Sequence, residues 1–163
     1  MSEPTDEFSH RALIDGLPWP VTTERLSIRP AEVGDAEPVW RYRQVAEVAE
    51  WMSSLHAELE AYAAKLEDPE WRSKMLVVER DGVLVGDLYL GVGDPWAQIE
   101  VKEQAAHSQA EIGWALDPAQ QGHGYAVEAA RELCGSASTP HPEGSACAGS
   151  WRCASRTTSP RGV

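Results

Sequence analysis

The sequence predicts an α/β (α+β) fold in which helices flank a sheet. Three observations lead to this prediction: an Asp-Gly turn joins two apolar runs, one stretch carries apolar residues at helical spacing, and a glycine-rich turn separates an apolar run from a helical one. One strand and several helices come first, three strands follow, and the glycine-rich turn leads into a last helix. The 163 residues are enough for one domain with a real core.

The first elements are predicted from alternation and capping. Residues 23–29 alternate apolar and polar side chains, which is typical of a strand. Pro30 ends this strand, because proline cannot donate to a strand ladder. A helix through Arg43 follows, and Asp35 is its expected N-cap.

The next region is predicted to be mainly helical. We expect helix and loop over residues 45–56, around Trp51. Apolar residues at helical spacing predict an amphipathic helix over residues 55–67, which Pro69 stops. These segments supply helices that flank the predicted sheet.

A β-hairpin is predicted after these helices. Residues 75–80 and 83–92 form its strands, and Asp81 and Gly82 supply a two-residue turn, since both tolerate a positive φ. Gly86 interrupts the second strand.

The last part of the body contains a strand, a turn and a helix. Residues 93–108 are polar and loop-like, although residues 99–101 are compatible with a short strand. Residues 110–116 predict a strand that an Asp-Pro pair ends, and a helical run occupies residues 127–134.

The composition excludes several functional classes. The net charge is −12, from 26 acidic residues and 14 lysines and arginines, which argues against nucleic-acid binding because that requires a basic face. No apolar run approaches the roughly 20 residues of a membrane span. The acidic, polar N-terminus is not typical of a signal peptide. We therefore expect a cytoplasmic enzyme or binding domain with no membrane partner, whose oligomeric state the sequence does not predict.

The composition changes near residue 134. Residues 135–163 hold one acid and three arginines but no Leu, Ile, Met, Phe or Tyr, so we expect this tail to be irregular or disordered. The three cysteines of the chain form no Cys-x-x-Cys pair, and no metal site is predicted. The expected organisation is a flexible lead-in over residues 1–21, a folded domain over residues 22–134 and the low-order tail.

The turn over residues 121–126 is predicted to bind an anion. Gly122 and Gly124 remove the Cβ atoms that would block close approach of a ligand. The helix that follows presents unpaired backbone N–H groups and the positive end of its dipole, which suits a phosphate. A glycine pair at a helix start is equally typical of a simple tight turn. The segment lacks the lysine of a P-loop and the third glycine of a dinucleotide fingerprint.

The same turn carries a family motif. Its sequence QGHGYA matches the pattern Q/R-x-x-G-x-G/A of the GNAT N-acetyltransferases, with Gln121, Gly124 and Ala126 at the three defining places. The preceding AEIGWALDP resembles the fourth strand of that family, and ERDGVLVGDLYL resembles its central hairpin. The segment TERLSIRPAEVGDAEPVWRYR resembles the first strand and helix of its RimJ/RimL-type branch, the ribosomal-protein acetyltransferases. The resemblance covers roughly residues 22–134.

The resemblance implies a mixed, mostly antiparallel GNAT-like sheet that binds acetyl-CoA as co-substrate. The acceptor would be a primary amine, either a protein N-terminus or a small amine. The diphosphate would lie on the N–H groups of residues 122–126, and the pantetheine arm would pair with the strand around residues 114–116, as an added strand does. The implied coenzyme contacts are Trp114, Ala115, Leu116, Gln121, Gly122, His123, Gly124, Tyr125 and Ala126.

Acetyl transfer to an amine needs a base, because the ammonium form is not nucleophilic. Glu111 is the candidate catalytic base, since it lies on the strand beside the expected acetyl position, with a structural carboxylate as the alternative. His123 lies in the phosphate turn, so we expect it to face solvent or touch phosphate rather than move a proton. Trp51, Trp96 and Trp114 are compatible with an acceptor cleft, but large aromatic residues are more often part of the core.

The chain departs from the family after residue 134. The family continues with a fifth strand, a further helix and a closing hairpin, which this sequence does not show. One set of synonymous codons for residues 144–163, read from the third base, encodes GLRR, ADN and SWR in family order. We therefore expect a frameshift near residues 134–136 and a domain that lacks the C-terminal strands and helix. A naturally diverged tail is the alternative.

The predicted function is transfer of an acetyl group from acetyl-CoA to an amine. We expect the activity of this truncated chain to be impaired, because loss of the fifth strand leaves the fourth as an unpaired edge and opens the core. Two other interpretations stay open. One is a non-catalytic remnant that binds CoA weakly or not at all, and the other is a small phosphate-binding module that uses the glycine turn.

Overall fold

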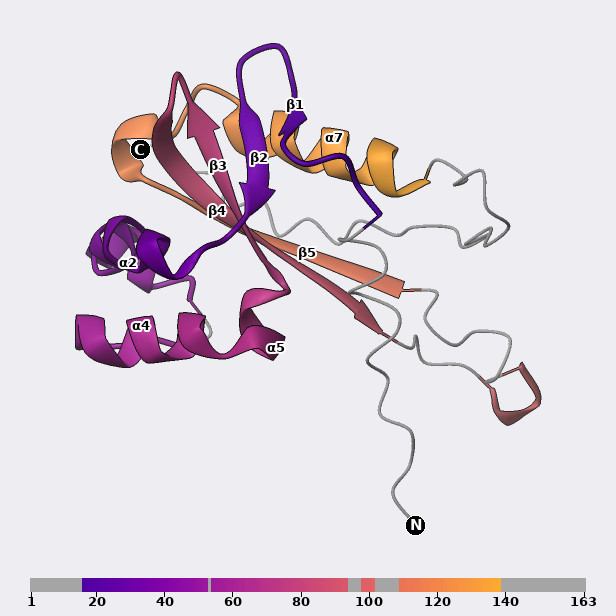
Figure 1. The fold of residues 1–163 in the computed structure, drawn as a ribbon, viewed down its shortest axis with the longest axis horizontal. Helices are drawn as coiled ribbons and strands as arrows, with labels where there is room; N and C mark the ends of the chain where they lie inside the picture. Colours follow the sequence, from indigo (N-terminus) through magenta and orange to yellow (C-terminus); the bar gives the residue numbers. More distant parts are fainter. Residues whose placement is uncertain (1–15, 53, 94–97, 102–108, 139–163) are drawn as a thin grey trace, which may run out of the picture.

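The protein is built on one antiparallel sheet. Its structure, a computed structural model, describes residues 16–52, 54–93, 98–101 and 109–138. The sheet has five strands in the order β1-β2-β3-β4-β5, and each pair of neighbours is antiparallel (Figure 1). The predicted α+β class is confirmed. The strands are β1 (Val21–Thr22), β2 (Ser27–Pro30), β3 (Met75–Arg80), β4 (Val83–Gly93) and β5 (Gln109–Leu116).

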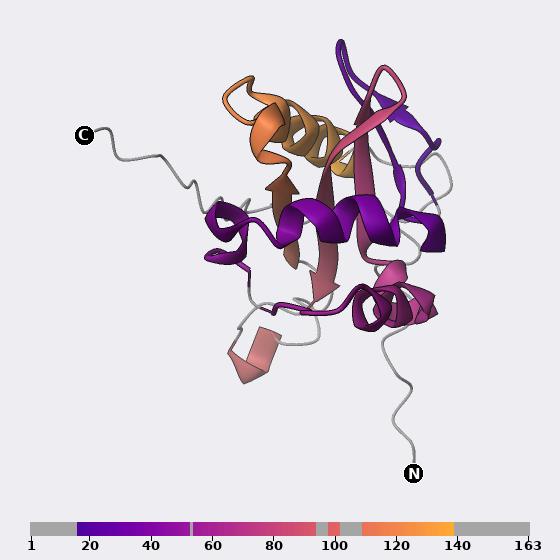
Figure 2. The same ribbon diagram turned by 90° about the vertical axis from the view of Figure 1, so that its left-hand side faces the viewer.

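Helices cover both faces of the sheet. Figure 1 shows α7 on one side, with α2, α4 and α5 on the other, and Figure 2 shows α2 crossing the strands. Short 3₁₀ turns lie at Val33–Asp35, Ile99–Val101 and Pro118–Gln120. The α-helices are α2 (Ala36–Arg43), α3 (Ala46–Ala49), α4 (Leu59–Glu67), α5 (Pro69–Arg72) and α7 (Tyr125–Ser138).

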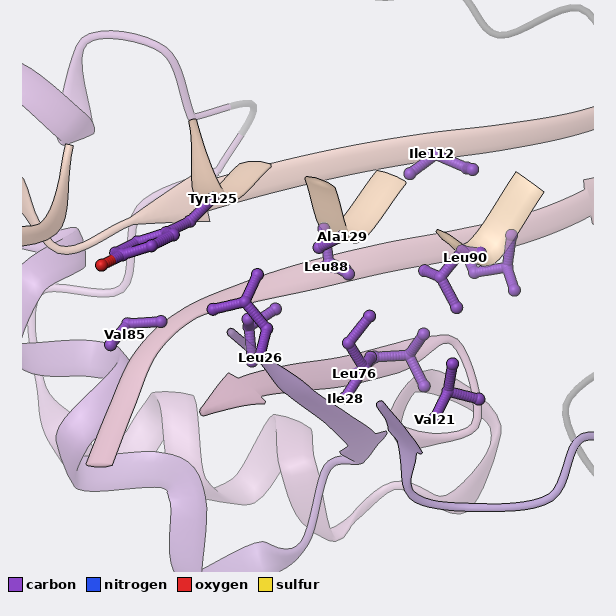
Figure 3. Close-up of a cluster of buried hydrophobic side chains, with 12 residues drawn as sticks. Val21, Leu26, Ile28, Leu76, Val85, Leu88, Leu90, Ile112, Tyr125 and Ala129 are labelled. Carbon is purple, nitrogen blue, oxygen red and sulfur yellow. The ribbon is translucent and has the colours of Figure 1, made fainter. Parts of the chain in front are cut away.

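Two apolar clusters hold these layers together. The first joins the sheet to α7, and Figure 3 shows its strand side chains converging on Tyr125 and Ala129. The second joins the opposite face to α2 and α4. Members of the first cluster are Val21, Leu26, Ile28, Leu76, Val78, Val85, Leu88, Leu90, Ile112, Tyr125, Ala129 and Leu133. Members of the second are Ala31, Ala36, Val39, Tyr42, Val48, Tyr62, Leu66, Met75, Val77 and Ala115.

The first predicted strand, over residues 23–29, contains a turn followed by the short strand β2, and β1 precedes it. The hydroxyl of Thr23 accepts the N–H of Leu26 at 2.9 Å, and the N–H of Thr23 donates to the Leu26 carbonyl, also at 2.9 Å. These bonds close a turn between β1 and β2, so only the second half of residues 23–29 pairs with β3. Of the expected lead-in, residues 1–15 lie outside the described residues, whereas Leu17 and Trp19 pack against the first cluster.

Asp35 occupies the predicted N-cap position of α2. However, its side chain makes no capping bond to that helix. Its carboxylate instead accepts both terminal nitrogens of Arg29 at 2.9 Å and the N–H of Glu32 at 2.7 Å. The half-buried Arg29 outcompetes the helix for this carboxylate because charge-assisted hydrogen bonds are the stronger ones.

The predicted amphipathic helix starts later than expected. It begins at Leu59, and Leu55 lies outside it with 54% of its surface exposed. At the other end, the carboxylate of Asp68 accepts the N–H of Glu70, which starts the separate helix α5 with proline at its first position. The predicted helix therefore began about one turn too early, because apolar spacing alone does not mark where a helix starts.

Two further expectations differ from the structure. Residues 99–101 form a 3₁₀ turn and not a strand. The last helix starts at Tyr125 and runs to Ser138, so residues 135–138, expected to be irregular, are helical. The rest of the expected tail, residues 139–163, lies outside the described residues.

The central hairpin is confirmed, with one feature that its pattern did not show. Asp81 and Gly82 have φ values of 51° and 76°, as a two-residue hairpin turn requires. Val78 pairs with Gly86 but Glu79 pairs with Leu84, so Val85 is an extra residue on β4. This β-bulge reverses which face the side chains of β4 meet, and it allows both Val85 and Leu88 to enter the first cluster.

Candidate functional site

The candidate site is the junction at which β5 passes into α7. The N–H of Asp117 donates to the Val85 carbonyl at 3.0 Å, which fixes the end of β5 to the bulged part of β4. The carboxylate of Asp117 accepts the N–H of Ala119 at 2.9 Å and caps the 3₁₀ turn, which has Pro118 at its first position. The chain therefore leaves the sheet in a defined direction.

The glycine turn has the conformation that its sequence predicts. Gly122 and Gly124 have φ values of +79° and +80°, which residues with a Cβ rarely adopt. Residues 121–124 are exposed, and a Cβ built on Gly122 would meet no atom within 4 Å. The N–H of Glu128 donates to the Gly124 carbonyl at 3.0 Å, which starts the α7 ladder. The first helical N–H groups thus follow an exposed, left-handed turn, an arrangement suited to an anion.

Tyr125 anchors this turn to the core. It is 1% exposed, and its hydroxyl accepts a hydrogen bond from Arg80 at the end of β3. Its ring stacks on His123 with a centroid distance of 5.3 Å and an interplanar angle of 14°. The His123 side chain is exposed, and its Nδ1 lies 3.2 Å from the Gln120 carbonyl oxygen. His123 therefore lies on the turn itself, as predicted.

A second anchor connects α7 to the β1–β2 turn. The Glu128 carboxylate accepts hydrogen bonds from the Thr23 hydroxyl at 2.5 Å and from Arg25 Nε and Nη2 at 2.8 and 2.5 Å. It also accepts the backbone N–H of Arg25 at 3.1 Å. The hydrogen bond from Thr23, together with those from Arg25, lowers the pKa of Glu128. The carboxylate is therefore anionic at neutral pH, within the first turn of α7.

The predicted contacts on β5 face both sides of the sheet. Ala115 is buried in the second cluster, whereas Trp114 and Leu116 are partly buried against the first. The side-chain amide of Gln121 donates to the Leu116 carbonyl at 3.3 Å, which brings the strand end and the turn together. The pantetheine-binding stretch and the phosphate turn of the sequence prediction are thus adjacent.

The candidate base Glu111 is exposed and lies on β5 opposite Gly91 of β4. Side chains alternate along a strand, so Glu111 shares a face with Ala115. The hydroxyl of Tyr89 lies over Gly91, at 2.7 Å from the position that a Cβ on that glycine would take. Tyr89 is therefore a neighbour of Glu111 across the two strands, which the sequence reasoning did not single out.

Beneath β5, a buried ion pair links α2 to the sheet. Asp87 is 1% exposed and pairs in register with Ala115. Its carboxylate accepts hydrogen bonds from the Tyr42 hydroxyl and from the guanidinium of Arg43. Burial, together with the charge of Asp87, raises the pKa of Tyr42. The pair holds α2 against β4, the strand that pairs with the one carrying the predicted coenzyme contacts.

Of the three tryptophans considered for an acceptor cleft, Trp51 is 62% exposed and so is not a core residue. Trp96 lies outside the described residues. Trp114 is partly buried against the α7 side. The sequence reasoning also missed the roles of Arg25 and Arg80, because each acts through a residue far away in the sequence and no local pattern marks it.

Comparison with protein families gives one match. The sequence model described as "Acetyltransferase (GNAT) domain" matches residues 25–148. Comparison with curated proteins gave no match. Among the described residues, no helix combines the length and apolar character that crossing a membrane requires.

Comparison with solved structures identifies similar folds. A GNAT-family acetyltransferase from Bacillus anthracis is 26% identical with a TM-score of 0.55, and the match covers 70% of this chain and 63% of that one. AAC(6')-Ib in complex with paromomycin and acetyl-CoA is 17% identical with a TM-score of 0.55, over 70% and 67% of the two chains. RimL, described as a ribosomal L7/L12 alpha-N-protein acetyltransferase, is 18% identical with a TM-score of 0.53, over 71% and 61%. This chain therefore spans less than two thirds of the Bacillus anthracis and RimL structures.

Proposed function

Because the chain belongs to the GNAT acetyltransferase family, we propose that it uses acetyl-CoA to acetylate a primary amine, either a protein N-terminus or a small amine. One observation carries the proposal: an exposed turn with two left-handed glycines opens α7 directly after β5. The absence of Cβ atoms at Gly122 and Gly124 leaves the backbone N–H groups open to a diphosphate. The residues present therefore fit the coenzyme.

In this proposal each part of the junction has a role in binding. The N–H groups of residues 122–126 hold the diphosphate, and His123 contacts it from the exposed side of the turn. Gln121 joins the turn to Leu116, so that the pantetheine arm pairs with the backbone at Trp114 and Ala115. Tyr125 fixes the turn from below through its contacts with Arg80 and His123.

The chemistry requires a proton acceptor on the chain. Acetyl-CoA supplies the thioester carbonyl carbon, to which the amine nitrogen bonds while the carbon–sulfur bond breaks. Glu111 takes the proton that the ammonium group must lose, directly or through a water molecule. Its exposed position on β5 supports this role, because an acceptor amine can reach it from solvent. After the carbon–nitrogen bond forms, the nitrogen loses its second proton, and the leaving thiolate takes up a proton, so that the products are the amide and the thiol of CoA.

The charge of the chain favours one class of acceptor. A net charge of −12 attracts cations by long-range steering, so a cationic amine is the preferred substrate. The complex of AAC(6')-Ib with paromomycin and the name of RimL show that this fold serves both small amines and protein N-termini in other proteins.

We further propose that residues 135–163 derive from a shifted reading frame and that activity is impaired as a result. The composition of this segment, without Leu, Ile, Met, Phe or Tyr, supports the proposal. The nucleotide sequence tests it directly: an open alternate frame that encodes the missing strands is expected after residue 134. A conserved reading frame over this segment in close relatives would contradict it.

Titration with CoA and with inorganic phosphate, combined with a thiol-release assay, tests the function itself. We expect the chain to bind CoA at least tenfold more tightly than phosphate, because the pantetheine arm adds contacts along β5. Binding without turnover would indicate a non-catalytic remnant, and equal affinity for the two ligands would indicate a simple anion-binding module. Failure to bind CoA would refute the proposed function.

A further inference from the structure

Glu128 carries a carboxylate in the first turn of α7, the helix whose N-terminal end holds the diphosphate in the proposed function. Its N–H closes on the Gly124 carbonyl at 3.0 Å. A carboxylate is favourable at a helix N-terminus when no other anion is present. A diphosphate bound at the same helix end would be repelled by it, since like charges disfavour each other.

Arg25, in the turn between β1 and β2, binds this carboxylate. Its guanidinium donates to one carboxylate oxygen, Oε2, from Nε at 2.8 Å and from Nη2 at 2.5 Å, and both are charge-assisted hydrogen bonds. Thr23 adds a hydroxyl donor at 2.5 Å. Because Glu128 is only 20% exposed and Arg25 40%, water screens this pair less than a fully exposed one.

The same guanidinium also contacts the turn. The Cζ of Arg25 lies 4.8 Å from the centroid of the Tyr125 ring. A Cβ built on Gly124 would lie 3.8 Å from Arg25 Nη2, so the cation is in van der Waals reach of the left-handed glycine. Arg25 therefore lies against the backbone that the coenzyme would use, while holding a carboxylate that would oppose it.

We propose that Arg25 is a positioning residue of the coenzyme site, which neutralises Glu128 and supports the turn so that a diphosphate can bind there. This inference rests on the proposed function and deepens it. The simpler alternative is that the pair only fastens the β1–β2 turn to α7. The two alternatives differ in sign: a fastening is weakened by removing either partner, whereas a neutralising cation and a repelling anion act in opposite directions.

Two single variants separate these alternatives. We expect Arg25→Met to weaken CoA binding about tenfold, because it uncovers the Glu128 carboxylate next to the diphosphate. We expect Glu128→Gln to tighten CoA binding about threefold, because it removes the opposing charge while the amide oxygen still accepts from Thr23. Dissociation constants come from isothermal titration of the full chain with CoA at low ionic strength, and both effects should shrink at high salt.

The Arg41–Glu37 pair on α2 supplies matched controls. It is exposed, with a nitrogen–oxygen distance of 2.7 Å. Arg41→Met and Glu37→Gln change the net charge by the same amounts as the test variants, and we expect each to alter CoA affinity less than twofold. Thermal melting of every variant shows whether it is folded. If Arg25→Met does not fold, Glu128→Gln still decides the sign.

The outcomes distinguish the two proposals. CoA binding by the unaltered chain, with opposite effects of the two variants, supports the role of Arg25. Weaker binding by both variants, or no change in either, overturns it while leaving the proposed function intact. No CoA binding by the folded, unaltered chain refutes the proposed function, and with it this inference.

Discussion

At Gly86 the sheet depends on a missing side chain. A Cβ on this residue would lie 2.4 Å from Leu116 Cδ2 and 2.6 Å from the Ala115 carbonyl oxygen. The second contact is with backbone, so it cannot be relieved by rotating a side chain. Gly86 thus lets β4 lie directly against the stretch of β5 that carries the predicted pantetheine contacts.

We therefore expect Gly86→Ala to destabilise the protein by about 1–3 kcal/mol, the usual cost of overpacking. Urea unfolding followed by circular dichroism measures this change. Gly34→Ala is the control, because a Cβ on Gly34 would meet nothing within 4 Å. Equal stability of the two variants would show that β4 and β5 can separate at this point without cost.

In the β3–β4 hairpin turn, Gly82 is required for its backbone conformation and not for lack of space. Gly82 has a φ of +76° and open space around its α-carbon. Gly82→Ala should cost about 1–2 kcal/mol, purely from placing a Cβ in the left-handed region. The same urea experiment measures the loss, and unchanged stability would mean that the turn relaxes to another type.

At the scale of elements, α2 is held to β4 by charge as well as by apolar contact. Asp87 is 1% exposed, and the Arg43 side chain opposite it is 17% exposed. Removing one partner of such a pair leaves an uncompensated buried charge, whereas replacing the whole group by apolar side chains does not.

Asp87→Ala is accordingly expected to destabilise the protein by about 3–5 kcal/mol. The triple variant Tyr42→Phe, Arg43→Met and Asp87→Leu should recover most of that loss, because it removes all three of these polar groups together and leaves none of them buried without its partner. Chemical denaturation of both variants tests this expectation. A triple variant no more stable than Asp87→Ala would show that packing, rather than charge, dominates this contact.

Elements with a local signal were predictable, and those fixed by distant partners were not. The β3–β4 hairpin follows from Asp81 and Gly82 alone, whose conformations a two-residue turn requires. The β1–β2 turn escaped prediction because its Thr23 hydroxyl and Arg25 side chain are fixed by Glu128, more than 100 residues later. The position of the candidate site was predictable from the glycine motif, but the arginines that support it were not.

At the scale of the whole molecule, acidic residues dominate, and several of them have specific partners. Burial alone would raise the pKa of Asp35, but the hydrogen bonds from Arg29 and from the N–H of Glu32 outweigh it, so that the pKa is lowered. A carboxyl with a lowered folded pKa contributes stability that is complete above its unfolded pKa of about 4 and is lost as the pH falls through the folded value.

The free energy of unfolding should therefore depend on Asp35 in a defined pH window. We expect the stability difference between the unaltered chain and Asp35→Asn to be largest at pH 7 and to shrink as the pH falls from about 4 through the lowered pKa of the folded Asp35, below which both side chains are neutral. Urea titrations at several pH values provide the measurement. A difference that stays constant down to pH 3 would show that Asp35 acts through its shape and not its charge.

The ion pair between Arg25 and Glu128 also constrains when this part of the protein can fold. Its two halves are separated by 103 residues, and the loop that it closes contains every strand from β2 to β5. During synthesis Arg25 leaves the ribosome early, but it cannot bind Glu128 until strands β2 to β5 have also emerged. The end of α7 that we propose as the diphosphate site is thus completed late, and a fragment that begins beyond Arg25 lacks this contact.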